Sequence, residues 1–263
     1  MPADDPAPLT SVSPFRLDGR VALVTGSSRG LGRAIAEGLG AAGAKVAFNY
    51  CNNAKTAEAA FEAFQSRGGK GGLFRADVSD PDDVSRLYDE VRAKLGAIDI
   101  LVCNATPDQP LKPIEEYDWA FFQQMLDFFV KSPYLLIRAC LPQMKAHKFG
   151  RIINITSEVF HLGTSPFSAY VAAKGAQTGL SRSLARELAS FGITVNSVAP
   201  GWIPVERHEK DPQSAKDGYL AMIPAGRWGQ PHDVAGAVVY FASQEAAFVT
   251  GQTISVNGGH TVH

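Results

Sequence analysis

Residues Val21–Glu37 read VALVTGSSRGLGRAIAE, which is an apolar run, a glycine-rich turn and the beginning of an amphipathic helix. The glycines follow the spacing G-x-x-x-G-x-G, whereas the better-known dinucleotide fingerprint is G-x-G-x-x-G. Glycines permit a tight turn that approaches a ligand closely, and the N–H groups at the start of a helix attract a pyrophosphate. A glycine-rich turn alone would be weak evidence, but a strand before it and a helix after it predict a dinucleotide-binding site.

Short apolar runs alternate with helical patterns along the rest of the chain. The expected strands are Val21–Thr25, Lys45–Asn49, Gly72–Ala76, Ile98–Cys103, Arg151–Thr156, Thr194–Ala199 and Thr253–Val256. The expected helices are Gly30–Ala42, Ala54–Arg67, Pro81–Lys94, Ile114–His147, Phe167–Ser190 and Pro231–Ala242. Strands that are apolar on both faces are typical of a covered parallel sheet. We therefore predict a Rossmann-type α/β fold, a doubly wound seven-stranded parallel sheet with helices on both faces.

The 263 residues are enough for one α/β domain, expected over residues 17–263, with residues 1–16 as a flexible extension rich in Pro, Asp and Ser. The extension lacks the basic-then-apolar order of a signal peptide, and no apolar stretch is long enough to span a bilayer. A net charge of −1 with interspersed acids and bases argues against nucleic-acid or membrane partners. The three Cys form no C-x-x-C pair and the six His show no metal-ligand spacing, so we expect a cytoplasmic protein without a metal site.

Tyr170 and Lys174 stand four residues apart in the segment YVAAK, thirteen residues after Ser157. Positions i and i+4 share a helix face, so the ammonium can lie beside the phenol and favour its phenolate form. A hydroxyl from a separate segment could hold a substrate oxygen during proton transfer. The trio therefore predicts an acid–base site, although Tyr-x-x-x-Lys alone is equally typical of a surface pair on an amphipathic helix.

Taken in order, these motifs resemble the short-chain dehydrogenase/reductase family, and most of all its branch that contains the 3-oxoacyl-[acyl-carrier-protein] reductases. The resemblance runs from about Leu17 to Gly259. Further matching segments are Asp77-Val78, Asn104-Ala105, Asn154–Ser157, Asn196–Gly201, Gly226–Gly229 and Val256–Gly259. The resemblance implies an enzyme that transfers hydride between NADP(H) and a ketone, a 3-oxoacyl thioester or a sugar- or polyol-like substrate. Its catalytic residues would be Ser157, which holds the substrate oxygen, Tyr170, which donates the proton, and Lys174, which lowers the phenol pKa and binds the nicotinamide ribose.

The cofactor preference can be read from the second expected strand, which ends in Asn49–Asn53 without the acidic residue that favours NAD. Arg29 lies inside the glycine turn, where a guanidinium can bind a ribose 2′-phosphate through two hydrogen bonds. Ser27, Asn49 and Asn52 could supply further hydrogen-bond donors to that phosphate. In the family this combination usually accompanies NADP(H), so we expect NADP(H) rather than NAD(H); an ion pair between Arg29 and a nearby acid is the alternative. The expected cofactor-binding residues are Gly26, Ser27, Ser28, Arg29, Gly30, Leu31, Gly32, Asn49, Tyr50, Asn52, Asp77, Val78, Asn104, Ala105, Tyr170, Lys174, Pro200, Gly201 and Ile203.

Three positions depart from the family pattern. Phe129 falls where many members carry an Asn that helps to hold a proton-relay water, and a phenyl ring has no hydrogen-bonding group. Thr106 replaces the Gly of Asn-Ala-Gly, and Val205 replaces a Thr that contacts the cofactor. The first departure leaves open a different relay, slow turnover or a different natural reaction.

Two other functions stay open: an enoyl-thioester reductase on the same scaffold, and a nonenzymatic NADP(H)-binding sensor, which fold alone does not exclude. A sensor would not need the proton donor that this chain retains. Residues 202–228 are expected to form a substrate loop, with 206–222 as a lid. The residues Glu158, Phe160, His161, Phe167 and Trp202 either line an apolar cleft there or pack beneath the lid. By resemblance we expect a homotetramer or homodimer that acts on a small-molecule substrate.

Overall fold

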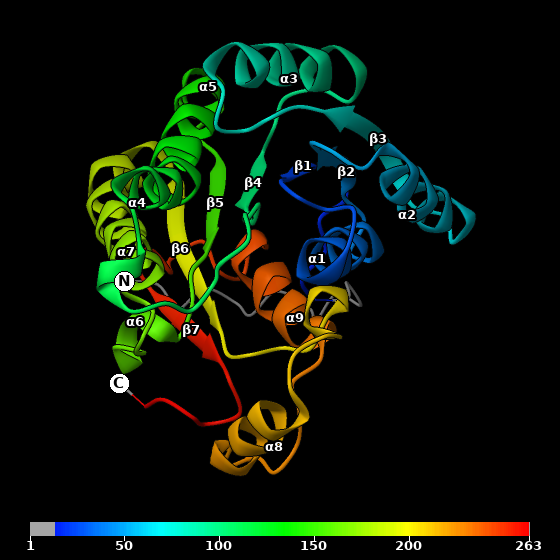
Figure 1. The fold of residues 1–263 in the computed structure, drawn as a ribbon. Coiled ribbons are helices and arrows are strands. Elements are labelled where there is room, and N and C mark those ends of the chain that lie inside the picture. Colours follow the sequence, from blue (N-terminus) through cyan, green and yellow to red (C-terminus); the bar gives the residue numbers. More distant parts are fainter. Residues whose placement is uncertain (1–13, 263) are drawn as a thin grey trace, which may run out of the picture.

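The computed structural model describes residues 14–262, so residues 1–13 of the expected extension 1–16 lie outside the described part of the chain. Its core is one seven-stranded parallel sheet in the order β3-β2-β1-β4-β5-β6-β7 (Figure 1). The strands are β1 (Val21–Val24), β2 (Lys45–Tyr50), β3 (Lys70–Arg75), β4 (Ile100–Cys103), β5 (Gly150–Ile155), β6 (Ile193–Pro200) and β7 (Thr253–Val256). The predicted fold class is confirmed, and strand ends differ from the expected ones by at most two residues.

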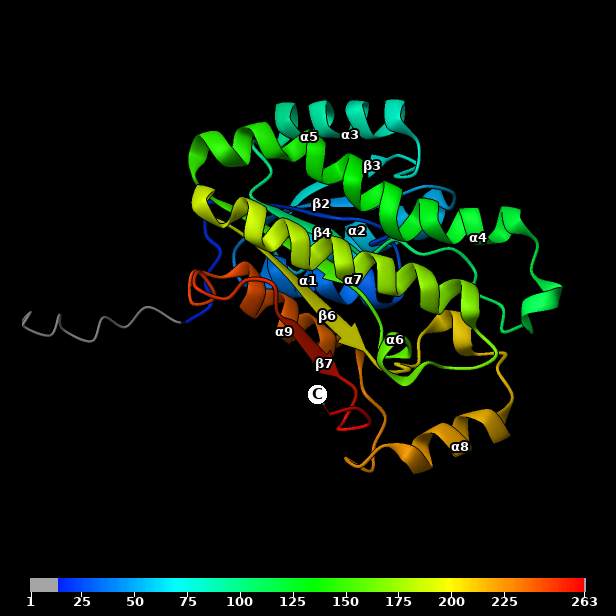
Figure 2. The ribbon, with the colours of Figure 1, turned by 90° about the vertical axis from the view of Figure 1, so that its left-hand side faces the viewer.

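Helices cover both faces of the sheet (Figures 1 and 2). One face carries α1 (Gly30–Ala41), α2 (Ala54–Ser66) and α9 (Pro231–Ala242), and the other carries α3 (Pro81–Lys94), α5 (Ser132–His147) and α7 (Ser168–Leu188). Side chains alternate along β1, so that Ala22 and Val24 belong to the first core, whereas Val21 and Leu23 belong to the second. This two-sided burial explains why the strands are apolar throughout. Among the described residues, no helix is long and apolar enough to cross a membrane.

The strand order reverses between β1 and β4, which are neighbours in the sheet although they are distant in sequence. Thr25 ties their carboxyl ends together: its Oγ1 accepts hydrogen bonds from the backbone N–H groups of Asn104 and Ala105, both at 2.9 Å. The same hydroxyl donates to the carbonyl of Val102 at 3.3 Å. The crevice at such a reversal is where ligands of doubly wound sheets bind.

The long helix expected over Ile114–His147 is interrupted in the structure. It consists of a 3-10 turn (Ile114–Glu116), α4 (Trp119–Leu126), a π-helical turn (Asp127–Lys131) and α5. Asp118 caps α4 by accepting a hydrogen bond from the Phe121 N–H at 2.8 Å. Pro133 has no N–H to donate to the carbonyl one turn earlier, which accounts for a wider turn just before it.

The segment expected as a substrate loop also contains regular structure. Within residues 202–228 lie a 3-10 turn (Glu206–His208) and the helix α8 (Gln213–Met222), and a short α6 (Val159–Leu162) precedes α7. Figure 2 shows α8 outside the two helical layers, below the ends of the central strands. The prediction of a plain loop was therefore wrong for residues 213–222.

The hydrogen bonds of the Thr25 hydroxyl lead us to expect a measurable effect on stability. Thr25→Val keeps the side-chain shape but leaves two backbone N–H groups without an acceptor, which should lower the free energy of unfolding by about 1–3 kcal/mol. Thr194→Val is the matched control, because the buried Thr194 hydroxyl has no hydrogen-bond partner in the described structure and its loss should be neutral or stabilising. Urea denaturation measures both; equal midpoints for the two variants would contradict the role of Thr25.

Candidate active site

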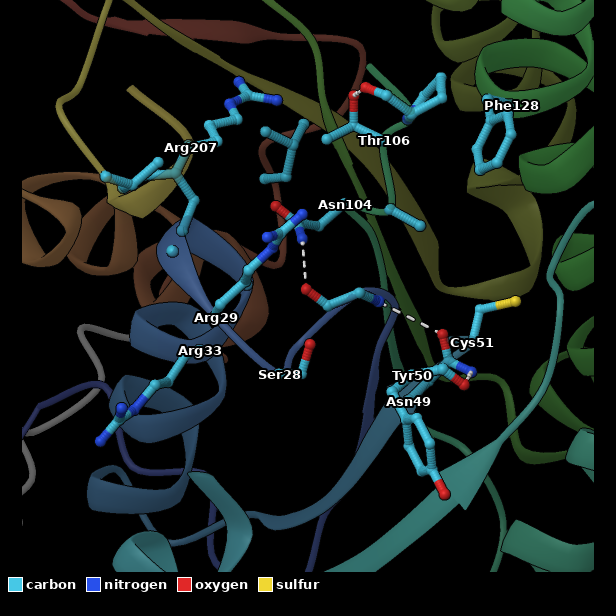
Figure 3. Close-up of a pocket in the computed structure, with 18 of the residues that line it drawn as sticks. Ser28, Arg29, Arg33, Asn49, Tyr50, Cys51, Asn104, Thr106, Phe128 and Arg207 are labelled. Carbon is cyan, nitrogen blue, oxygen red and sulfur yellow. Dashed lines mark hydrogen bonds between the residues drawn. The ribbon is translucent and has the colours of Figure 1, made fainter. Parts of the chain in front are cut away.

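A cavity of about 1050 Å³ opens at the carboxyl ends of the strands, where the sequence places its conspicuous motifs (Figure 3). The expected site residues that line it are Gly26, Ser28, Arg29, Gly30, Leu31, Gly32, Asn49, Tyr50, Asn52, Asp77, Val78, Asn104, Ala105, Ser157, Tyr170, Lys174, Pro200 and Gly201. Ser27 and Ile203 do not line it, because both are buried beneath the wall. The structure therefore brings residues from the ends of six strands, β1 to β6, and from α1 and α7 to one cavity.

The glycine turn is shaped by close approach to its neighbours. A Cβ at Gly32 would lie 2.3 Å from the carbonyl oxygen of Gly26 and 2.5 Å from Asn104 Nδ2, so no other residue fits there. Asn104 Nδ2 donates to the Thr25 carbonyl at 2.9 Å, and Asn49 Oδ1 accepts from the Gly26 N–H at 3.2 Å. Arg29, the residue before α1, makes no side-chain cap, so the first N–H groups of α1 are left for an anion.

Basic side chains line the part of the cavity wall that the glycine turn, α1 and α2 form. In Figure 3 the side chains of Arg29 and Arg33 lie on the same side of the view, and Lys55 at the start of α2 also lines the wall. Arg29 forms no ion pair with any described residue, so the alternative of a local acid partner is not observed, whereas Arg33 pairs with Glu37 at 2.9 Å. The sequence analysis missed Arg33 and Lys55; the signals were a second arginine one turn after Arg29 and a lysine just after the second strand.

Two residues expected to supply hydrogen-bond donors to a ribose phosphate are already engaged. Ser27 Oγ accepts from the Asn49 N–H at 3.0 Å. Asn49 Nδ2 donates to the Ala76 carbonyl at 3.1 Å. The side chains of Ser27 and Asn49 therefore stabilise the glycine turn. Of the three expected donors, only Asn52 remains accessible at the cavity wall.

Ser157, Tyr170 and Lys174 meet in the same wall, since β5 ends just before Ser157 and α7 carries the other two. Lys174 Nζ donates to the Ile155 carbonyl at 2.7 Å and to Gln177 Oε1 at 3.0 Å. The Tyr170 ring packs against Phe167, with 4.8 Å between ring centroids. Tyr170 and Lys174 are both buried, which rules out the alternative of an ordinary surface pair.

Burial governs the ionisation of this trio. It raises the pKa of Tyr170 to about 12, while the charge of Arg207 and a hydrogen bond with Ser157 lower that pKa. Burial also lowers the pKa of Lys174 well below its usual value, and the Arg207 charge lowers it further. The phenol of Tyr170 is therefore protonated at neutral pH. Burial disfavours its phenolate form, an effect that the sequence pattern did not indicate.

Arg207 is a second residue that the sequence analysis missed. It belongs to the 3-10 turn Glu206–His208, lines the cavity and is exposed. Its Nε lies 3.0 Å from His208 Nε2, and it forms no ion pair with any described residue. The available signal was that Arg207 is the first basic residue after Pro200-Gly201.

Glu158 and Trp202 do not line the cavity but hold α8 in place. Tyr219 from α8 donates its hydroxyl proton to Glu158 Oε1 at 2.5 Å and accepts the Trp202 N–H at 2.7 Å. Glu158 Oε2 accepts from Asn257 Nδ2 at 2.9 Å and lies 3.2 Å from His260 Nδ1. Burial and the Glu158 carboxylate both raise the pKa of the Tyr219 hydroxyl. Of the two expectations for these residues, packing beneath the lid segment is the one observed.

Comparison with known proteins finds close relatives along nearly the whole chain. The family model described as enoyl-(acyl carrier protein) reductase matches residues 26–261. The 3-oxoacyl-[acyl-carrier-protein] reductase of Staphylococcus aureus is 41% identical over 240 residues, which is 90% of this chain and 96% of that protein. The Escherichia coli protein of the same name is 41% identical over 247 residues, covering 93% of this chain and 98% of the relative.

Solved structures give the same result. A gluconate 5-dehydrogenase from Burkholderia cenocepacia in complex with NADP and tartrate superposes with a TM-score of 0.87 and 35% identity, covering 94% of this chain and 96% of the other. A 3-oxoacyl (acyl-carrier-protein) reductase from Agrobacterium tumefaciens with NADP bound gives a TM-score of 0.86 and 33% identity, covering 93% and 95%. Relatives of this similarity share the fold and differ in substrate.

The anchoring of α8 predicts that Tyr219→Phe loosens this helix. The variant leaves Glu158 without one donor and the Trp202 N–H without its acceptor, so stability should fall by about 1–3 kcal/mol. Amide hydrogen exchange over residues 213–222 should accelerate. Tyr134→Phe is the control, because the Tyr134 hydroxyl lies on an exposed side chain and accepts only from Arg138. Unchanged exchange in α8 of the Tyr219 variant would refute the anchoring role.

Proposed function

The chain belongs to the short-chain dehydrogenase/reductase family, and we propose that it transfers hydride between NADP(H) and a carbonyl or alcohol substrate at Ser157, Tyr170 and Lys174. The substrate classes in view are a ketone, a 3-oxoacyl thioester and a sugar- or polyol-like compound. The observation that carries the proposal is the convergence of these three side chains on the cavity that also holds the glycine turn. A dinucleotide and a small substrate can then meet at one proton donor.

The wall offers suitable groups for each part of NADP(H). The open N-terminus of α1 suits the pyrophosphate, and Arg29, Lys55 and Asn52 suit a ribose 2′-phosphate. No carboxylate ends β2, which agrees with the preference for NADP(H). Two solved relatives that carry NADP support the same choice.

The bound cofactor supplies the hydride, and the protein supplies orientation and the proton. Tyr170, protonated at neutral pH, donates its proton to the carbonyl oxygen as the carbon is reduced. The Ser157 hydroxyl holds that oxygen in place, and Lys174 lies beside the phenol that must become negative. In alcohol oxidation the proton moves in the opposite direction.

Reduction of a carbon–carbon double bond is the second candidate, because the matching family model carries the description enoyl-(acyl carrier protein) reductase. Phe129 at the place of the usual Asn also fits a departure from carbonyl chemistry. An assay with NADPH and a panel of ketones, acetoacetyl thioesters and crotonyl thioesters separates the two candidates. Cofactor binding without turnover of any panel member would favour a sensor instead.

We further propose self-association as a homodimer or homotetramer through the layer of α4, α5 and α7, and a cytoplasmic location. Trp119 on α4 is a large hydrophobic side chain that stays 70% exposed in a single chain. Burial of such residues between subunits would be favourable. Sedimentation velocity at micromolar concentration tests the proposal, and a monomer would refute it.

Tyr170→Phe tests the assignment of the proton donor. Removal of the hydroxyl should reduce turnover by a factor of about 100 or more, because general acid catalysis contributes 10²–10⁴-fold. NADPH affinity, measured by fluorescence titration, should stay near the parental value. Tyr134→Phe serves as the control and should keep parental turnover. A Tyr170 variant with near-parental turnover would show that another group donates the proton.

Arg29→Ala tests recognition of the 2′-phosphate. Loss of a charge-assisted hydrogen bond should weaken NADPH binding by roughly 10- to 100-fold, while NADH binding changes little. Arg67→Ala is the control, since Arg67 pairs with Glu37 and does not line the cavity. If both arginine variants bind NADPH equally well, a different group carries the preference.

A further inference from the structure

We propose that Gln177 and Phe129 act as positioning residues that form a dry seat for the Lys174 ammonium and keep it charged beside Tyr170. The inference deepens the proposed function and rests on its assignment of Tyr170 and Lys174. It concerns the side of Lys174 that faces α4 and the π-helical turn, away from the glycine turn. Neither seat residue was among the expected site residues.

The first part of the seat is the amide of Gln177. An ammonium has three N–H donors and no acceptor, so the side chain at 3.0 Å must present its oxygen to Nζ. Gln177 lies one turn after Lys174 on α7 and is 1% exposed. With the Ile155 carbonyl at 2.7 Å, two of the three donors are satisfied inside the protein. One donor remains for the cavity.

The second part of the seat is the ring of Phe129. Lys174 Nζ lies 3.7 Å from its centroid, the range in which a cation is attracted to the face of an aromatic ring. Phe129 is 1% exposed and belongs to the π-helical turn Asp127–Lys131. Its ring also meets Tyr170 edge to face, with centroids 5.3 Å apart. A ring at this distance leaves no room for water between itself and the ammonium.

The seat is needed because the surroundings of Lys174 otherwise favour the neutral amine. Burial and the charge of Arg207 both lower the pKa of Lys174. The titratable and charged groups around it are Tyr170 on α7, whose ring centroid lies 5.5 Å from Nζ, Cys103 at the end of β4, which raises the pKa of Lys174, and Arg207 in the 3-10 turn, which lowers it. None of them is a carboxylate. The Gln177 oxygen, the Ile155 carbonyl and the Phe129 ring are therefore the groups that hold the proton on Lys174.

The seat also explains the departure at Phe129. A polar side chain at this place would support a water near the lysine, whereas Phe129 excludes one and Gln177 provides a fixed acceptor instead. The role of Phe129 is then to retain the charge of the Lys174 ammonium. The proton that Tyr170 donates must be replaced from the cavity.

The test is the ionisation midpoint of Tyr170, measured without any substrate. Phenolate absorbance is followed against pH with saturating NADP⁺, because the positive nicotinamide ring beside the phenol should lower its midpoint from that of the free protein into the range where Lys174 still carries its proton. The signal of Tyr170→Phe is subtracted. Gln177→Met keeps the side-chain length but loses the acceptor, so Lys174 should lose its proton more easily. The Tyr170 phenolate then has no positive charge beside it. The Tyr170 midpoint should rise by about one pH unit. Phe129→Leu should shift it in the same direction by a smaller amount, since it removes only the ring face.

Thr178→Val is the matched control, because the buried Thr178 hydroxyl bonds only the backbone carbonyl of Lys174, at 2.8 Å. It should leave the midpoint unchanged. If Gln177→Met does not fold, Gln177→Asn replaces it, since the shorter amide draws its oxygen away from Nζ. Melting temperature and NADPH binding establish which variants are folded.

Midpoints of the folded Gln177 and Phe129 variants equal to that of Thr178→Val would overturn the seat. Shifted midpoints support the seat even if the parental protein turns over no member of the substrate panel. That absence of turnover would reject the proposed function alone. Where turnover is found, the rising limb of kcat/KM for alcohol oxidation should move to higher pH by the same amount as the midpoint.

Discussion

The contact between the glycine turn and the end of β4 is the constraint on which the rest of the site depends. Gly32 lies so close to Gly26 and Asn104 that a single methyl group would separate them. This approach directs the N-terminus of α1 toward the crevice at the reversal of strand order. Thr25 and Asn104 then hold the β1 and β4 ends together, and the cavity wall is built outward from that point.

Burial gives the catalytic side of the cavity its electrostatic character. Tyr170 and Lys174 sit in a third hydrophobic cluster formed by α4, the π-helical turn and α7, apart from the two cores that cover the sheet. Inside it the neutral forms of both groups are favoured, so charge must be retained by specific contacts. This chain makes those contacts with an amide oxygen, a backbone carbonyl and a ring face.

The segment after β6 is held in a different way, by polar contacts between separate parts of the chain. Glu158 fastens Tyr219 of α8 and the residues Asn257 and His260 near the C-terminal end into one buried network. Arg207 places a positive charge near the proton donor from the same region of the chain. Relatives named as a 3-oxoacyl-[acyl-carrier-protein] reductase and as a gluconate 5-dehydrogenase match nearly the whole chain, at 41% and 35% identity, so the shared fold alone does not decide the substrate.

The sequence by itself determined the strand–turn–helix at Val21–Glu37, the seven strands with the main helices between them, and the positions of Ser157, Tyr170 and Lys174. These features depend on local preferences: glycine in tight turns, apolar strands, and the shared face of residues i and i+4. The helix α8 and the burial of Ser27 were decided only by tertiary structure. So was the meeting of Phe129, Ile155 and Lys174, since residues that far apart in sequence come together only when α7 packs against β6, the neighbour of β5, and against the π-helical turn. Local conformation is encoded by neighbouring residues, whereas the pKa and the partners of a buried side chain depend on everything packed around it.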